Sequence, residues 1–165
     1  MKLRKKDKHY FELVTHILNK KDFKKIKNFS HHGTNRLKHS MRVSYYSYKI
    51  ARFFKLDYKA SAISGLLHDF FLGEEDGTPK NFFKFQIEHP KIAAKNAKHH
   101  FNISKKEENI IETHMFPFTK PSKYIEGWII SFVDKTIGTY EYTIKFKTQF
   151  SLWFALFLNL FRVGR

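Results

Sequence analysis

Two adjacent side chains, His68 and Asp69, close an apolar segment and offer the clearest chemistry in the sequence. Residues 57–69 are rich in Ala and Leu and predict a buried helix, with Asp57 as its N-cap. The apolar residues 70–72 follow directly. Because burying a carboxylate is costly unless it is paired or bound to a metal, the His-Asp pair requires partners elsewhere in the chain.

The partners that could share a metal with this pair are imidazoles and carboxylates along the chain: His39, His89, His114 and Asp134. Together with His39 and Asp134, the pair offers two nitrogen and two oxygen ligands. This mixture suits borderline metals such as Mn, Fe, Co, Ni or Zn better than Mg. If Asp69 bridges two ions, His89 and His114 can hold the second. Two metals can clamp the attacking and leaving oxygens of a phosphoryl transfer.

The order His…His-Asp…His…His…Asp, with KHSMRV around His39 and FVDK around Asp134, resembles the HD-domain superfamily of metal-dependent phosphohydrolases. The resemblance extends over residues 30–142 and is closest to small bacterial HD proteins, including the dinuclear HD-type dinucleoside-tetraphosphate hydrolases. It implies an all-α fold, a single HD-domain helical bundle, acting on a nucleotide or a related phosphate ester or anhydride.

The resemblance also implies a cofactor of one or two divalent transition metals (Fe, Mn, Co, Ni or Zn). The implied metal ligands are His39, His68, Asp69, His89, His114 and Asp134. Of these, His89 and His114 are the two that mark the dinuclear subgroup. The implied catalytic residues are Asp69, His68 and Lys135.

Positive side chains near the expected ligands are the candidates for contacting a substrate phosphate. Arg36 and Arg42 lie three residues either side of His39, and Lys135 follows Asp134. Several HD hydrolases carry Gly or Lys soon after the His-Asp pair, where this chain has Phe-Phe-Leu at 70–72. Either Lys135 or an arginine supplies the charge here, or the substrate is unusual. This departure leaves open an HD-fold metalloprotein that binds a nucleotide or a macromolecule with little or no turnover.

The net charge of +16 favours polyanionic partners, such as nucleotides, nucleic acid or anionic lipid. Lysine far outnumbers arginine, a profile that an AT-rich coding bias also produces. A nucleic-acid-binding module would explain the charge but not six ligand-type residues in one known order. The favoured partner is therefore a phosphate-containing small molecule, and nucleic acid is the weaker alternative.

Apolar periodicity predicts helices and gives no convincing strand alternation, in keeping with an all-α fold. One helix is expected to begin at Pro90, with His89 as its N-cap. Another follows the capping box Ser104–Glu107. The phenylalanines of 82–85 are expected to pack. The other expected helices cover 5–20, 22–29, 35–54 and 57–69, with a last one opening at Pro121-Ser122.

A chain of 165 residues predicts one domain, here with three expected parts. These are an N-terminal helical extension at 1–29, the HD domain at 30–142 and a C-terminal apolar and basic helix at 143–165. Residues 150–161 are apolar almost all round but too short to span a bilayer, which predicts core packing, a homo-oligomer interface or peripheral membrane contact. The absence of cysteine and of a signal peptide predicts a cytoplasmic protein.

Overall fold

The computed structural model describes residues 7–31 and 34–162, of which 30–31, 73–74 and 153–162 are described by their backbone alone, and it confirms the all-α prediction. One antiparallel pair of two-residue strands, β1 (Ser30–His31) and β2 (Thr34–Asn35), accompanies the helices. The helical elements are α1 (Lys8–Leu18), α2 (Lys21–Lys25), η1 (Ile26–Asn28), α3 (Arg36–Phe53), α4 (Tyr58–Leu67), η2 (Gly73–Asp76), α5 (Phe82–Phe101), α6 (Lys105–Thr113) and α7 (Ile125–Arg162).

Side-chain caps fix where the central helices begin. Asn35 accepts a hydrogen bond from the Lys38 amide at 2.9 Å and so starts α3. Asp57 accepts from the Ala60 amide at 3.0 Å at the start of α4, as the sequence predicts. At α6 the predicted capping box of Ser104 and Glu107 is formed in both directions. These caps satisfy amides that have no partner inside their own helix.

The prediction that a helix starts at Pro90 with His89 as its cap is wrong. α5 begins eight residues earlier, at Phe82, where Asn81 caps the Lys84 amide at 3.1 Å. Pro90 lies inside the helix, which tolerates the loss of the one backbone hydrogen bond that a proline cannot donate. The expectation that the phenylalanines of 82–85 pack holds only in part. Phe82 and Phe83 are 61% and 66% exposed.

α4 lies in close contact with α3 because the helices meet at a glycine. A Cβ atom on Gly65 would stand 2.9 Å from the Ser44 Cα, so any side chain there would push α3 away. The Ser44 hydroxyl also donates to the Ala62 carbonyl at 2.6 Å, which joins the two backbones. This approach brings the end of α4, with His68, beside His39 on α3.

The expected N-terminal extension shares its core with the rest of the bundle. Tyr10, Val14 and Ile17 on α1 are fully buried in one apolar cluster with residues of α4 and α5, including Leu66 and Ala93. A second cluster joins α3 to α6 and to the first half of α7. The helices therefore surround the end of α4 on several sides.

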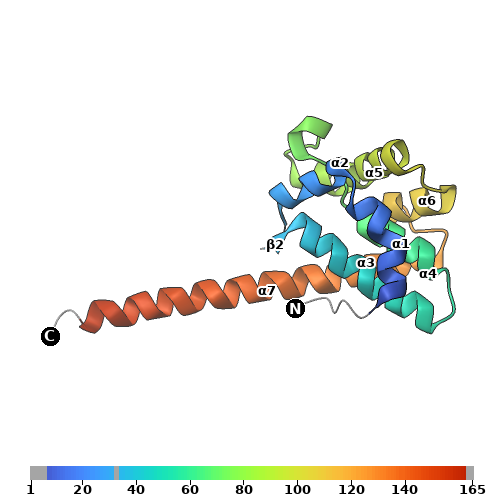
Figure 1. The fold of residues 1–165 in the computed structure, drawn as a ribbon. Coiled ribbons are helices and arrows are strands. Elements are labelled where there is room, and N and C mark those ends of the chain that lie inside the picture. Colours follow the sequence, from blue (N-terminus) through green and yellow to red (C-terminus); the bar gives the residue numbers. More distant parts are fainter. Residues whose placement is uncertain (1–6, 32–33, 163–165) are drawn as a thin grey trace.

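α7 is one continuous helix across residue 142, the expected boundary of the C-terminal part. Its first half packs on α3, and its second half projects well beyond the bundle (Figure 1). The side chains of 142–152 are all exposed. Most side chains of the predicted contact segment 150–161, and the chain ends at 1–6 and 163–165, lie outside the described residues. In the ranges that are described, no helix is long and apolar enough to cross a bilayer.

Candidate metal centre

Five helices bring the six predicted ligands to one buried place. His39 comes from α3, His68 and Asp69 from the turn that ends α4, and His89 from the middle of α5. His114 follows the end of α6, and Asp134 lies on the first half of α7. All six side chains are buried. The tertiary structure thus joins residues that are up to 95 positions apart in the sequence.

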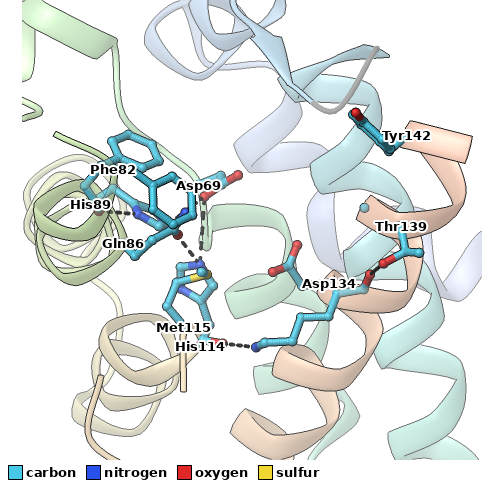
Figure 2. A pocket seen from close by; sticks show the side chains of 12 residues that line it. Asp69, Phe82, Gln86, His89, His114, Met115, Asp134, Thr139 and Tyr142 are labelled. Carbon is cyan, nitrogen blue, oxygen red and sulfur yellow. Dashed lines mark hydrogen bonds and ion pairs between the residues drawn. The ribbon is translucent and has the colours of Figure 1, made fainter. Parts of the chain in front are cut away.

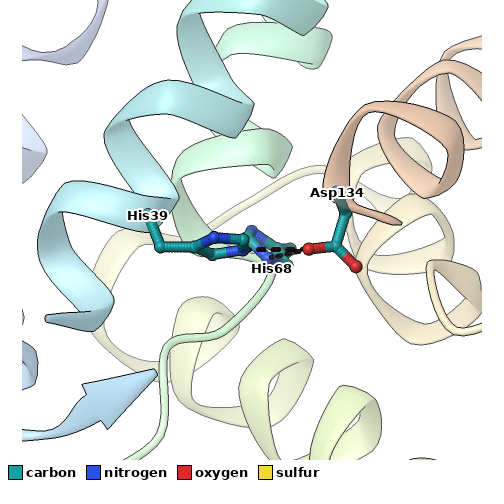
Figure 3. A group of neighbouring side chains, drawn as sticks. All are labelled: His39, His68 and Asp134. Carbon is teal, nitrogen blue, oxygen red and sulfur yellow. Dashed lines mark hydrogen bonds and ion pairs between the residues drawn. The ribbon is translucent and has the colours of Figure 1, made fainter. Parts of the chain in front are cut away.

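The first group of ligand atoms consists of His39, His68 and Asp134 (Figure 3). The Nε2 atom of His39 lies 2.9 Å from Oδ1 of Asp134. The Nε2 atom of His68 lies 3.5 Å from the same oxygen. All three ligand atoms fall within 4.8 Å of one another, so a single ion could contact them together.

The second group consists of His68, Asp69 and His114, with His89 beside them. Oδ2 of Asp69 lies 3.6 Å from Nε2 of His68. Its other oxygen, Oδ1, lies 3.5 Å from Nε2 of His89 and 3.9 Å from Nε2 of His114. The Asp69 carboxylate therefore directs one oxygen towards His68, which belongs to both groups, and the other towards His89 and His114.

Four hydrogen bonds orient the histidines in the same way. The Nδ1 atom of His68 donates to the Gly65 carbonyl at 2.9 Å. Those of His89 and His114 donate to backbone carbonyls three or four residues earlier, at 2.7 and 2.8 Å. His39 uses the Glu141 carboxylate instead, at 2.8 Å. In every case Nε2 is left to face the centre, which is the arrangement that metal-binding histidines require.

The Nε2 atoms of three buried histidines fit a bound cation. The Nε2 atom of His68 has no hydrogen-bond partner among the described residues. The Nε2 atoms of His89 and His114 face each other at 3.3 Å, although both rings already donate through Nδ1. Opposed lone pairs in an apolar environment are unfavourable unless a positive charge lies near both. The donor set is therefore suited to divalent metals of borderline character.

Burial and neighbouring charges shift the pKa values of the histidines in opposite directions. Burial disfavours the charged form of His39, but hydrogen bonds to Asp134 and Glu141 outweigh it and raise its pKa to about 10. Burial, together with the nearby His68 and His89, lowers the pKa of His114 to about 3. Burial also lowers the pKa of His89. The groups near Asp69 Oδ1 are thus neutral imidazoles, ready to act as ligands.

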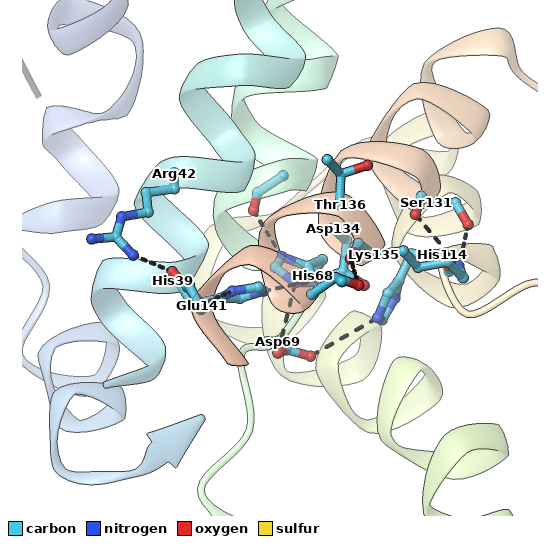
Figure 4. Close-up of polar contacts among 12 residues, drawn as sticks. His39, Arg42, His68, Asp69, His114, Ser131, Asp134, Lys135, Thr136 and Glu141 are labelled. Atoms are coloured by element: carbon cyan, nitrogen blue, oxygen red, sulfur yellow. Dashed lines mark hydrogen bonds and ion pairs between the residues drawn. The ribbon is translucent and has the colours of Figure 1, made fainter. Parts of the chain in front are cut away.

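Glu141 is a functional candidate that the sequence reasoning missed. It is buried on α7, and Oε2 accepts the hydrogen bond from His39 while Oε1 accepts one from Arg42 (Figure 4). Its position could have been noticed, because it follows Asp134 by seven residues and so occupies the same face of one helix. A second acidic residue on this buried helix face is as unexpected from packing as Asp134 itself.

The predicted phosphate contacts Arg36 and Arg42 do not line the pocket beside the metal centre. Arg36 is buried, donates to the Phe71 carbonyl and stacks on the Phe71 ring at 3.8 Å from its centroid. Arg42 pairs with Glu141 behind His39. Arg36 is therefore buried against Phe71 and Arg42 is paired with Glu141, so neither arginine faces the pocket.

The pocket is shown in Figure 2 and has a volume of about 550 Å³. Lys135 is one of the residues that line it. Its ammonium donates to the Ser131 hydroxyl at 2.7 Å and to the His114 carbonyl at 3.3 Å. Burial lowers the pKa of Lys135, and the charge of Asp134 opposes this shift. The pocket also contains Asp69, His89, His114 and Asp134, so an incoming molecule meets the expected ligands and a lysine together.

Comparison with known proteins identifies a family for most of the chain. The family model described as HD domain matches residues 36–138, which includes all six predicted ligands. No curated protein and no solved structure gives a significant match to the chain.

Proposed function

The chain belongs to the HD-domain family, and on this premise we propose that it is a metal-dependent phosphohydrolase acting on a nucleotide or a related phosphate ester or anhydride. The observation that carries the proposal is Asp69, whose two oxygens face different groups of imidazoles. A carboxylate with this placement suits a pair of ions better than one. The proposed cofactor is one or two divalent transition metals (Fe, Mn, Co, Ni or Zn).

Bound cations of this kind supply Lewis-acid activation of water and neutralise charge on the phosphoryl group. The residues of the chain hold and orient the reacting groups. In the proposal, His68 belongs to both groups of ligands, and Asp69 lies between His68 and the other two imidazoles of the second group. Lys135 offers its ammonium to the phosphate oxygens, since it lines the pocket and is anchored by Ser131. Lys135 is preferred to Arg36 and Arg42 because neither arginine lines the pocket.

The test is metal content per chain measured together with turnover of a phosphate panel. The panel contains AMP, ADP, ATP, a dinucleoside tetraphosphate and inorganic pyrophosphate, each assayed after loading with Mn, Fe, Co, Ni or Zn. We expect bound transition metal and release of phosphate or nucleotide from at least one compound. Absence of bound transition metal under every loading condition would contradict the proposal.

The competing function is a metalloprotein or nucleic-acid-binding module with little or no turnover. The net charge of +16 favours this alternative, whereas the convergence of six buried ligand-type side chains favours the phosphohydrolase. Tight RNA or DNA binding that falls steeply with salt, without hydrolysis of the panel, would support this alternative.

The projecting end of α7 supports an attachment role as a separate part of the proposal. The exposed side chains on 142–152 include Phe146, Phe150 and Leu152, and the sequence stays apolar to residue 161. Such a segment suits contact with a second copy of the chain or with the periphery of a membrane. A cytoplasmic location is proposed as well, supported by the lack of cysteine in the sequence.

A further inference from the structure

The pocket beside the metal centre has two chemically different ends. One end holds the expected ligands and Lys135, and the other has the exposed rings of Phe82 and Tyr142. Figure 2 shows Phe82 on the α5 side and Tyr142 on the α7 side, with Asp69, His114 and Asp134 between the two helices. Both rings are open to an incoming molecule, since Phe82 is 61% and Tyr142 is 63% accessible.

The spacing of these rings from the ligands follows from helix geometry. Phe82, Gln86 and His89 occupy one face of α5, and Phe82 precedes His89 by two turns, about 10 Å along the axis. On α7, Tyr142 follows Asp134 by slightly more than two turns, about 12 Å. Each wall of the pocket therefore leads from a metal ligand to an aromatic ring.

Between the two ends lie polar groups that can accept or donate hydrogen bonds. Gln86 is half-buried in the pocket wall, and its amide has no hydrogen-bond partner among the described residues. Thr139 lies on the opposite wall. A molecule that fills the pocket would thus present a phosphate to the ligands, polar atoms to the middle and a flat apolar group to the rings.

We propose that Phe82 and Tyr142 form a stacking site for the base of a nucleotide whose phosphate lies at the metal centre. The proposal rests on the phosphohydrolase function and deepens it by naming the group that the far end of the pocket recognises. A base suits the rings because stacking on an aromatic face tolerates any base. An aryl phosphate such as phenyl phosphate does not fit, because its ring is bonded directly to the phosphate and cannot reach two helical turns away.

Phe83 provides a matched control for Phe82. The two rings are neighbours, with centroids 5.5 Å apart, both contact Phe118, and Phe83 is 66% exposed. Phe83, however, does not line the pocket. Replacing either ring by Ala removes the same exposed apolar surface, so a difference between the two variants reports on the pocket.

The experiment measures binding of etheno-AMP, whose fluorescence changes when its base stacks, and turnover of AMP, ADP, ribose phosphate and phenyl phosphate. We expect Phe82→Ala and Tyr142→Ala to weaken etheno-AMP binding about tenfold each, as loss of a stacking ring does. Phe83→Ala should stay within about twofold of the unchanged protein. Ribose phosphate and phenyl phosphate should be poor substrates for every form.

Equal effects of Phe82→Ala and Phe83→Ala would overturn the stacking site. So would wild-type turnover of ribose phosphate or phenyl phosphate as efficient as that of AMP, and this result would leave the phosphohydrolase function standing. If instead Phe82-dependent binding of etheno-AMP occurs but no phosphate compound is hydrolysed, the phosphohydrolase function fails and the nucleotide site is supported.

Discussion

The imidazole of His39 lies between two carboxylates, with Nδ1 2.8 Å from Oε2 of Glu141 and Nε2 2.9 Å from Oδ1 of Asp134. Glu141 in turn pairs with Arg42, so its own charge is balanced (Figure 4). By accepting the hydrogen bond from Nδ1, Glu141 orients the ring so that Nε2 faces Asp134. This arrangement is the one in which an outer carboxylate raises the basicity of a metal-binding histidine.

Replacing Glu141 by Gln keeps the shape of the side chain but removes the charge that orients His39. We expect Glu141→Gln to weaken metal affinity about tenfold to a hundredfold, the usual cost of losing such an outer partner. Affinity is measured by competition with a chelator, alongside circular dichroism to verify the fold. A Thr143→Ala variant, exposed on the same helix and outside the pocket, serves as the control. Unchanged metal affinity in Glu141→Gln would show that the contact is only structural.

Asp69→Asn should abolish hydrolysis and remove most of the bound metal. Asn preserves the volume, but it lacks the negative charge that faces His68 on one side and His89 and His114 on the other. Elemental analysis of the purified variant is the measurement, with hydrolysis assayed in parallel. A variant that keeps full metal and full activity would exclude Asp69 as the shared ligand.

His89→Ala and His114→Ala should each remove one metal preferentially. Both histidines face Oδ1 of Asp69, whereas His39 and Asp134 form the other group. We therefore expect the metal content of each variant to fall towards half that of the unchanged protein, with hydrolysis reduced. Full metal content in both variants would mean that the centre is mononuclear and that these two histidines serve the fold.

The stability of the metal-free protein should depend on pH with opposite signs at His39 and His114. The pKa of His39 is raised from its ordinary value of 6.5 to about 10 in the fold. Its contribution to the free energy of unfolding is therefore complete below pH 6.5 and is lost as the pH rises towards 10. The pKa of His114 is lowered to about 3, so the unfolded chain binds a proton that the folded chain cannot. The free energy of unfolding therefore decreases as the pH falls from 6.5 towards 3.

These two contributions give the metal-free protein its highest melting temperature near pH 6.5. The measurement is thermal unfolding in the presence of a chelator across this pH range. His114→Gln should flatten the acidic side of the profile, and His39→Gln the alkaline side. Profiles that keep their shape in both variants would show that other groups control the pH dependence.

Truncation after Tyr142 tests the role of the projecting end of α7. The side chains of 143–152 are exposed, so deleting the chain from residue 143 onward should leave the bundle and its metal binding intact. We expect a change in oligomeric state, measured by light scattering, or in recovery with anionic vesicles. A truncated chain that is unchanged in both measurements would contradict an attachment role. A truncated chain that unfolds would show that the segment belongs to the core.

The sequence by itself predicted the residues of the centre, because a carboxylate in an apolar helical segment is an anomaly that packing does not explain. Asp69 and Asp134 stand out in this way, and the order of the histidines supplied the rest of the set. Local rules also predicted the caps at Asp57 and Ser104 and the all-α class, since these depend on neighbouring residues and periodicity.

Only the tertiary structure decided how the positive and aromatic residues are used. Arg36 and Arg42 flank His39 in the sequence, yet Arg36 stacks on Phe71 and Arg42 pairs with Glu141, both partners that lie far away in the chain. Pro90 favours a helix start because its missing amide is harmless there, but packing carries α5 through it. Whether a side chain meets a ligand or another side chain depends on contacts between distant helices, which local sequence does not determine.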